Sequence, residues 1–235
     1  MTAPAAHALA PGVWRIPVAP WDGINAFVLQ GDDDQVTLID AGMPWAWKRL
    51  EQGLEHIGIH VQDITNIVVT HAHGDHVGNV ERARQESQAP VTAHTLDAPF
   101  LASGQCPPID PQRPFRPLLM KWGRFDQISV SDTFTDGELL NLAGGLRAVH
   151  TPGHTPGHTS YIHEPTGTLI TGDVIHYWRS AIRIGMKLYC HDIALNEESA
   201  QKLAQADCEI VAFTHGPHLA SQGRMRLHAF LATLG

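Results

Sequence analysis

The 235-residue chain contains little cysteine, no excess of basic residues and no long apolar run. Its three cysteines, Cys106, Cys190 and Cys208, lie far apart in the sequence, which argues against a disulfide framework and a thiolate zinc site. Lysine and arginine total 16 against 24 acidic residues, so nucleic acid is not an expected partner. Because no segment resembles a signal peptide or a membrane span, we expect a cytoplasmic protein with no membrane partner.

Histidine, in contrast, is abundant, with 16 residues in the chain. Histidine is the commonest metal ligand in proteins, so this excess directs attention to a metal site. The remaining composition is ordinary for a globular protein, with 43% hydrophobic and 17% charged residues. Disordered, collagen-like and coiled-coil structures are therefore excluded.

Short β-branched and apolar runs alternate with segments of helical spacing. Residues 13–39 contain three predicted strands without a helix between them, which favours a mixed sheet over a purely parallel one. The predicted fold class is therefore α/β, with layered mixed sheets. Strands are predicted at residues 13–18, 24–29, 36–39, 67–70, 146–149, 159–162, 168–171 and 210–214, and helices at 45–57, 77–87, 195–206 and 222–234.

Two local patterns recur in the two halves of the chain. Residues 37–40 (TLID) resemble residues 168–171 (TLIT), and residues 68–71 (VVTH) resemble residues 211–215 (VAFTH). Such short matches also arise by coincidence. If the repeat is real, each half supplies strand ends to one shared edge, where open sheets place their chemistry.

The proline-rich segment 103–126 interrupts the alternation of strands and helices. Long stretches without regular structure inside a compact domain are usually functional or mobile, so this segment is a candidate lid over a site. A surface excursion that covers a helix is the alternative.

Four side chains able to bind metal lie within six residues, directly after the predicted strand 67–70. The sequence there is His71-Ala72-His73-Gly74-Asp75-His76. In an extended segment, His71 and His73 project to the same side and can chelate one ion. Gly74 permits a sharp turn, after which Asp75 and His76 are presented from the start of the next helix, placed for a second ion.

This string resembles the His-x-His-x-Asp-His signature of the metallo-β-lactamase superfamily. The resemblance extends to residues 38–42 (LIDAG), 151–158 (TPGHTPGH), 171–173 (TGD) and 214–217 (THGP), which follow in the family's order. It implies an αββα sandwich, in which two mixed β-sheets are flanked by outer helices. It also implies a single domain over residues 1–235.

The resemblance implies seven metal ligands: three for a first ion, three for a second and one that bridges both. In that order they are His71, His73 and His154; Asp75, His76 and His215; and Asp173. The implied cofactors are two divalent metal ions. Zn²⁺ is expected, with Fe or Mn as alternatives, because imidazole and carboxylate ligands do not distinguish these metals. Asp40 is expected to orient ligands, and His158 to have a structural role.

Three residues are assigned to catalysis. Asp75 both ligates a metal and orients the attacking hydroxide, whereas His176 and Tyr177 follow Asp173 closely and offer a donor for the oxyanion of a tetrahedral intermediate. In quorum-quenching lactonases of the superfamily, a tyrosine stands third after the bridging aspartate; here His176 holds that position. Cationic side chains recur at Arg179, Arg183 and Lys187, either as a solvated helix face, which charge patterns favour, or as a stripe that receives an anionic group of a substrate.

The resemblance implies a dinuclear metal-dependent hydrolase in which a metal-bridging hydroxide attacks a small-molecule ester, lactone or thioester. A mononuclear iron enzyme similar to persulfide dioxygenases is an alternative. A second is a thioesterase similar to glyoxalase II without its C-terminal domain, because few residues follow His215. A third, a non-catalytic binding protein, is disfavoured by the complete ligand set. The expected partner is a small-molecule substrate, and no sequence pattern fixes the oligomeric state.

Overall fold

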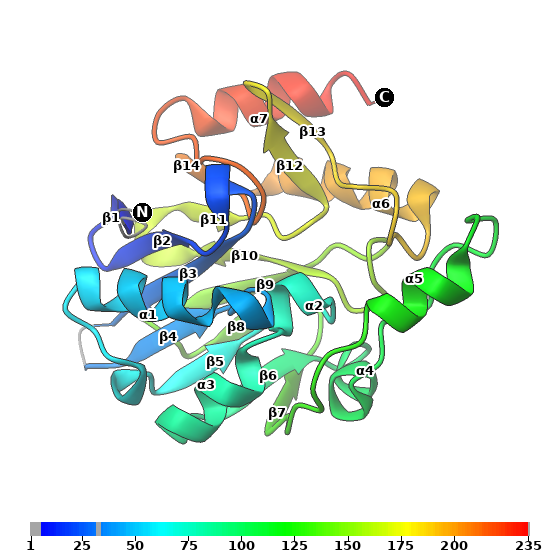
Figure 1. Cartoon of the computed structure of the whole chain (residues 1–235). Coiled ribbons are helices and arrows are strands. Elements are labelled where there is room, and N and C mark those ends of the chain that lie inside the picture. Colours follow the sequence, from blue (N-terminus) through cyan, green and yellow to red (C-terminus); the bar gives the residue numbers. More distant parts are fainter. Residues whose placement is uncertain (1–5, 32–33, 235) are drawn as a thin grey trace.

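A computed structural model describes residues 6–31 and 34–234 of the chain. Two β-sheets pack face to face, and helices cover the outer face of each sheet (Figure 1). This arrangement confirms the predicted αββα sandwich with mixed sheets.

The strands of the first sheet lie side by side in the same order as in the sequence. Its strands are antiparallel from β1 to β4 and parallel from β4 to β7. They are β1 (His7–Ala10), β2 (Val13–Pro17), β3 (Asn25–Gln30), β4 (Val36–Ile39), β5 (Asn66–Val68), β6 (Val91–His94) and β7 (Asp132–Phe134).

The second sheet has the order β14-β11-β10-β9-β8, in which only the β11–β14 pair is parallel within the described part of the chain. A separate antiparallel hairpin is formed by β12 and β13. The strands are β8 (Leu139–Leu140), β9 (Leu146–His150), β10 (Thr159–His163), β11 (Thr168–Ile170), β12 (Ile175–Trp178), β13 (Ala181–Ile184) and β14 (Ile210–Ala212).

The α-helices are α1 (Trp47–His56), α2 (Gly74–Val77), α3 (Val80–Ser87), α4 (Ala98–Ser103), α5 (Arg116–Trp122), α6 (Ile193–Ala200) and α7 (Gly223–Leu231). Short 3-10 turns include η1 (Pro20–Asp22), η2 (Pro44–Ala46), η3 (Val61–Asp63), η4 (Glu164–Thr166) and η5 (Gln201–Gln205). The helix predicted at 77–87 is divided into α2 and α3. The segment 103–126 is not structureless, because it contains α5.

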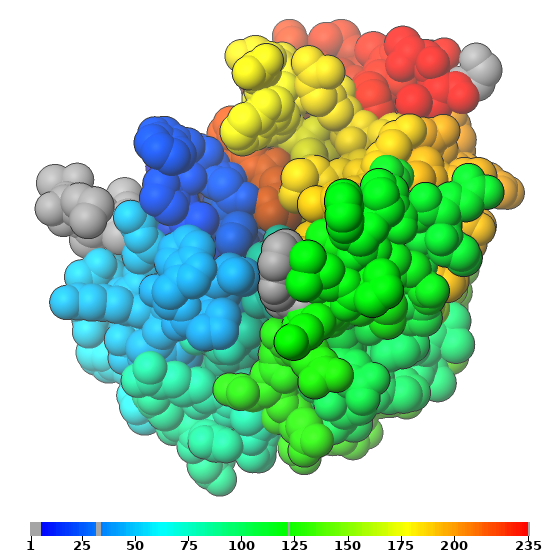
Figure 2. Space-filling model, turned by 45° about the vertical axis from the view of Figure 1, so that its right-hand side comes forward, coloured from blue at the N-terminus to red at the C-terminus, as the bar shows by residue number. Residues whose placement is uncertain are grey.

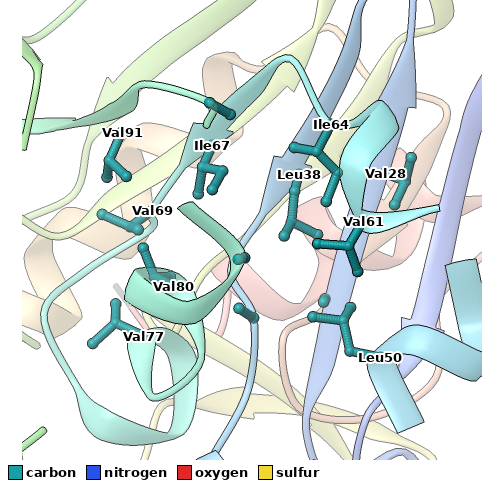
Figure 3. Close-up of a cluster of buried hydrophobic side chains, with 14 of the residues drawn as sticks. Val28, Leu38, Leu50, Val61, Ile64, Ile67, Val69, Val77, Val80 and Val91 are labelled. Carbon is teal, nitrogen blue, oxygen red and sulfur yellow. The ribbon is translucent and has the colours of Figure 1, made fainter. Parts of the chain in front are cut away.

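Alternating side chains distribute the strands between two hydrophobic layers. In β3, Ala26 and Val28 face the helices, whereas Phe27 and Leu29 face the second sheet. This follows from the two-residue period of a strand, which explains why an almost continuously apolar run is buried on both faces. Figure 3 shows the helix-facing layer, in which strand side chains meet α1 and the α2–α3 segment; its labelled residues are Val28, Leu38, Leu50, Val61, Ile64, Ile67, Val69, Val77, Val80 and Val91.

The side chains of the second sheet also point alternately to two hydrophobic layers. Ile170 and Ala212 face the first sheet, whereas Leu169 and Val211 face the helical layer formed by α6, η5 and α7. None of the helices in residues 6–31 and 34–234 combines the length and apolar character needed to cross a membrane.

The two halves of the chain supply equivalent strand pairs. In the first sheet β4 pairs with β5 in parallel, and in the second β11 pairs with β14 in parallel. The segments that follow β5, β11 and β14 bring residues 71, 173 and 215 together. The interpretation of the sequence repeat as two halves that meet at one edge is therefore supported by the topology.

Candidate metal centre

The histidine-rich string lies where the first sheet ends beneath α2. His71 follows β5 after a short connection, His73 has extended backbone angles, and His76 lies in α2. All three side chains are buried. The turn at Gly74 therefore brings the helix-borne His76 to within 4.1 Å of His71, measured between ring centroids.

Three further loops complete the cluster. His154 comes from the β9–β10 loop, Asp173 follows β11, and His215 follows β14. The potential ligand atoms of His71, His73 and His154 lie within 4.8 Å of one another, as do those of Asp75, His76 and His215. The structure thus brings together the two predicted groups. Two further groups overlap with them, namely His71, His76 and Asp173, and Asp173, His176 and His215.

The tautomers of two clustered histidines can be inferred from their outer contacts. The Thr70 hydroxyl donates its single hydrogen to Asp40 Oδ2 over 2.7 Å, so it can only accept from His71 Nδ1, which is 3.0 Å away. Similarly, His76 Nδ1 donates to Asp40 Oδ2 over 2.9 Å. In its neutral form, each ring therefore has an unprotonated Nε2.

The surroundings of the histidine Nε2 atoms are those expected of metal ligands. The Nε2 atoms of His71, His76, His176 and His215 are buried and have no hydrogen-bond partner among the described residues. The His73 Nδ1 and His154 Nε2 atoms face each other over 3.0 Å. Buried nitrogens without donors are costly unless a ligand occupies the space between them, and imidazole nitrogens held by an outer oxygen are typical of metal sites.

Asp173 lies between the two groups. Its Oδ2 is 3.5 Å from His154 Nε2 and 3.1 Å from His215 Nε2, and its Oδ1 is 3.4 Å from His76 Nε2. The Thr214 hydroxyl lies 2.7 Å from Asp173 Oδ1 and 2.7 Å from the Gly172 carbonyl, so these two acceptors share its single hydrogen. A single carboxylate therefore contacts histidines of both groups, which is the position expected of a bridging ligand.

Asp40 contacts residues that hold or form the cluster, in agreement with the orienting role expected from the sequence. It accepts from the Thr70 backbone amide over 2.8 Å as well as from the Thr70 hydroxyl and His76. Its φ of 59° lies in the left-handed region, which Asp tolerates better than most residues. The buried carboxylate thus fixes both the end of the β5 segment and the orientation of His76.

Asp97 has a comparable role that the sequence analysis missed. It precedes α4 and is buried. It accepts from the backbone amides of Ala72 and Gly157 over 2.9 and 2.7 Å, and from the Thr155 hydroxyl over 2.7 Å. Because Ala72 separates His71 from His73 and Thr155 follows His154, one carboxylate ties together the two loops that carry the first group.

His158 supports Asp173 from the backbone side. Its Nε2 accepts from the Asp173 amide over 2.7 Å, and its Nδ1 donates to the Thr151 carbonyl over 3.0 Å. Burial lowers the pKa of His158 to about 3, so its ring is neutral near neutral pH. The structural role expected for His158 agrees with these contacts.

Burial and the carboxylates have opposite effects on the ligand candidates. Burial lowers the pKa of His71 well below its ordinary value and that of His73 to about 4. For His76, burial is outweighed by the nearby carboxylates, chiefly Asp173, and the pKa is raised well above its ordinary value. Burial would raise the pKa of Asp173, but the imidazoles of His215 and His76 hold it well below its usual range. Burial thus favours neutral rings in the first group, whereas the neighbouring carboxylates favour a proton on His76 when no ion is bound.

The structure separates the two residues proposed as oxyanion donors. His176 Nε2 lies 3.2 Å from Asp173 Oδ2, within the cluster. The Tyr177 hydroxyl instead accepts from Arg226 over 2.7 Å, and its ring stacks on Phe213. Neighbouring residues of a strand face opposite sides, so the structure does not bring Tyr177 to the centre.

The solvated helix face favoured for the three cationic residues is not found in the described structure. Arg179 lies in the β12–β13 turn, Arg183 lies on β13, and Lys187 follows that strand. Their four-residue spacing therefore does not produce a helical face. Lys187 pairs with Glu197 over 2.7 Å.

Two cavities border the cluster. One of about 460 Å³ is lined by His176 and His215 together with residues of the β12–β13 hairpin. The other, of about 360 Å³, is lined by His73, Asp75, Phe125 and Tyr189, among others. The segment 103–126 therefore reaches the centre through Phe125; its action as a lid remains a prediction.

Comparison with known proteins gives results consistent with this geometry. The sequence model of the metallo-beta-lactamase superfamily matches residues 19–215. The uncharacterized protein YobT of Bacillus subtilis is 32% identical over 91% of this chain and 93% of its own length. The probable metallo-hydrolase YqjP of the same organism is 27% identical over 84% of this chain and 68% of its own length.

A solved structure supports the fold assignment. A metallo-beta-lactamase family protein from Thermus thermophilus superposes with a TM-score of 0.73 at 26% identity. The superposition covers 96% of this chain and 80% of that protein.

Proposed function

The chain belongs to the metallo-beta-lactamase superfamily, and we propose that it is a dinuclear hydrolase of small-molecule esters, lactones or thioesters. At the coarser level, the chain is a metallo-hydrolase of this superfamily with a His/Asp cluster suited to metal. The finer proposal rests on the two ligand groups that share contacts with Asp173. One carboxylate between two sets of nitrogens favours two ions over one.

The first ion would be held by His71, His73 and His154, and the second by Asp75, His76 and His215, with Asp173 contacting both. We expect zinc, which nitrogen and carboxylate ligands bind well, with Fe and Mn as alternatives because the same donors bind them. When bound, such ions supply an acidified water and polarise the carbonyl group of a substrate. The remaining chemistry is assigned to the chain's own residues.

Asp75 is the most exposed carboxylate of the set, with 31% of its side chain accessible. Its Oδ2 faces His76 and His215 over 3.6 and 3.5 Å. The side chain also borders the cavity beside His73. We assign to Asp75 Oδ1 the role of taking up a proton from the entering water and delivering it to the leaving group.

His176 borders the other cavity and contacts Asp173. A ring in this position can donate to the carbonyl oxygen of a substrate that enters from the hairpin side, which is the oxyanion role proposed from the sequence. Tyr177 is not included in this role, because its hydroxyl binds Arg226.

The experiment is metal analysis combined with a hydrolysis panel of lactones, thioesters, β-lactams and phosphodiesters. We expect two zinc ions per chain in the wild type, and loss of both metal and hydrolysis in His71→Ala and Asp173→Asn. Arg82→Gln is the control, because Arg82 is exposed on α3 and its only ion pair in the described structure is with Glu86.

Turnover that persists in a variant without bound metal would refute the site. One iron per chain with oxygen consumption would favour the persulfide dioxygenase alternative. The ranking within the panel separates thioesterase activity of the glyoxalase II type from lactone and ester hydrolysis.

A further inference from the structure

The 460 Å³ cavity has one wall that belongs to the metal centre and another that does not. His176 and His215 form the inner wall, and Trp178, Ile184 and Met186 form an apolar wall. In Figure 2 the surface is hollowed between the dark blue segment that contains η1 and the yellow segment that contains the β12–β13 hairpin. A molecule bound in this cavity therefore lies directly against the centre.

The apolar wall is unusually exposed. Trp178 and Met186 each keep 54% of their surface accessible. Large exposed apolar side chains beside a cavity are typical of a binding surface, because a ligand removes them from water. Their position predicts that the ligand has an apolar portion.

Arg183 adds a charge to the same cavity. It is the direct cross-strand partner of His176 in the β12–β13 hairpin. Directly paired residues project from the same face, with Cβ atoms about 5 Å apart. The side chain of Arg183 therefore leaves the hairpin beside His176, which contacts Asp173.

The guanidinium of Arg183 has no carboxylate partner among the described residues; its Nε donates to the Trp178 carbonyl over 3.5 Å. Lys187, by contrast, is paired with Glu197. In a chain with a formal charge of −8, an unpaired guanidinium in the wall of a cavity is a site for an anionic group of a ligand.

The hairpin holds this arginine in a defined register. Arg179 and Ser180 connect the two strands with φ values of 49° and 62°. Left-handed conformations at both central residues are those of the type I′ turn, which fits the twist of a two-residue hairpin. The pairing of Arg183 with His176 is therefore set by the backbone.

We propose that Arg183 binds the anionic group of an amphipathic acyl substrate whose apolar portion lies on Trp178 and Met186. The acyl chemistry rests on the proposed hydrolase function, whereas the binding does not. The anionic group is one that presents two oxygens to the guanidinium, as a carboxylate or a phosphate does and as the sulfonate probe below does.

The test uses calorimetric titration of the metal-loaded protein with octane-1-sulfonate and with 1-octanol, two probes of equal chain length that differ in charge. We expect Arg183→Gln to weaken sulfonate binding about 10- to 100-fold and to leave octanol binding within about twofold. Trp178→Ala should weaken both probes. Arg179→Gln is the matched control, because Arg179 lies in the same hairpin but outside the cavity lining.

Unchanged sulfonate affinity in Arg183→Gln would overturn the proposal, and so would an equal loss for both probes. Sulfonate binding that depends on Arg124, which lines the cavity on the other side of the centre, would also overturn it. Because neither probe is hydrolysed, these outcomes are independent of the ester, lactone and thioester panel. A failure of the panel would refute the proposed function without bearing on Arg183.

Discussion

Asp40 Oδ2 accepts a hydrogen bond from His76 Nδ1 over 2.9 Å, and neither side chain is exposed. We predict that Asp40→Ala weakens metal binding by the second group about 10- to 100-fold, because His76 loses the acceptor that fixes its tautomer. Equilibrium dialysis with metal quantification measures this loss. Asp40→Asn separates the lost charge from backbone strain, because Asn also tolerates φ near 59°. Unchanged affinity in both variants would contradict the prediction.

Asp97 provides a test of stability without metal. Asp97→Ala leaves the amides of Ala72 and Gly157 and the Thr155 hydroxyl without their acceptor. An unsatisfied buried donor costs about 1–3 kcal/mol, so we expect a loss of roughly 3 kcal/mol in the free energy of unfolding. Urea unfolding of the chelator-treated protein measures it. A loss below about 1 kcal/mol would show that the two loops are held by other contacts.

Metal removal should lower the melting temperature. The buried Nε2 atoms of His71, His76 and His215 are left without partners when no ion is bound. A ligand at 100 times its dissociation constant stabilises the folded state by about 2.7 kcal/mol. Thermal unfolding with zinc and with chelator measures the difference, which should nearly vanish in Asp173→Asn. A difference as large in that variant as in the wild type would place the stabilising ion elsewhere.

His158 makes the stability of the metal-free protein depend on pH. Burial lowers its pKa to about 3, whereas an unfolded histidine titrates near 6.5. The folded state binds fewer protons, so this contribution is full above pH 6.5 and is lost as the pH falls towards 3.

Between pH 6.5 and 4.5, the free energy of unfolding should therefore fall by about 2–3 kcal/mol more in the wild type than in His158→Gln. Urea unfolding of both proteins at the two pH values measures these losses. The other histidines titrate in both proteins, so their contributions cancel in the comparison. Equal losses would mean that His158 is not buried as a neutral ring.

Gly172 is predicted to resist substitution. Its φ is 57°, and a Cβ atom would lie 2.4 Å from His158 Nε2, the nitrogen that accepts from Asp173. Gly58→Ala is a matched control, because Gly58 has a φ of 74° but open space around it. Both substitutions incur about 1–2 kcal/mol of backbone strain. Only Gly172→Ala should also weaken metal binding, as measured by dialysis, and equal metal affinity in the two variants would contradict this.

The main strands and the clustered side chains could be predicted because they are encoded locally. In β3, uninterrupted apolar residues indicated a strand, and the string from His71 to His76 follows directly after the predicted strand 67–70. The short strands β1, β6, β7, β8, β12 and β13 were missed, because runs of two to four residues rarely stand out from loops.

The remaining features depend on contacts between distant residues. Asp97 is 25 residues from Ala72 and 60 from Gly157, so no local pattern indicated its role. The assignment of Tyr177 failed because the side of a strand changes with every residue, and the register of β12 was unknown. The four-residue spacing of Arg179 and Arg183 resembled a helix, although the chain passes from a turn into β13 there.

The distance in sequence between the clustered residues determines when the centre can form. His71 is available early in synthesis, but His215 follows β14, which must first pair with β11. Pairing between distant strands is slow because the intervening loop must be closed before contacts compensate for its entropy. The cluster is therefore complete only after β14 has paired with β11, and a chain that stops before β14 would keep His71, His73, His76 and His154 but lack His215.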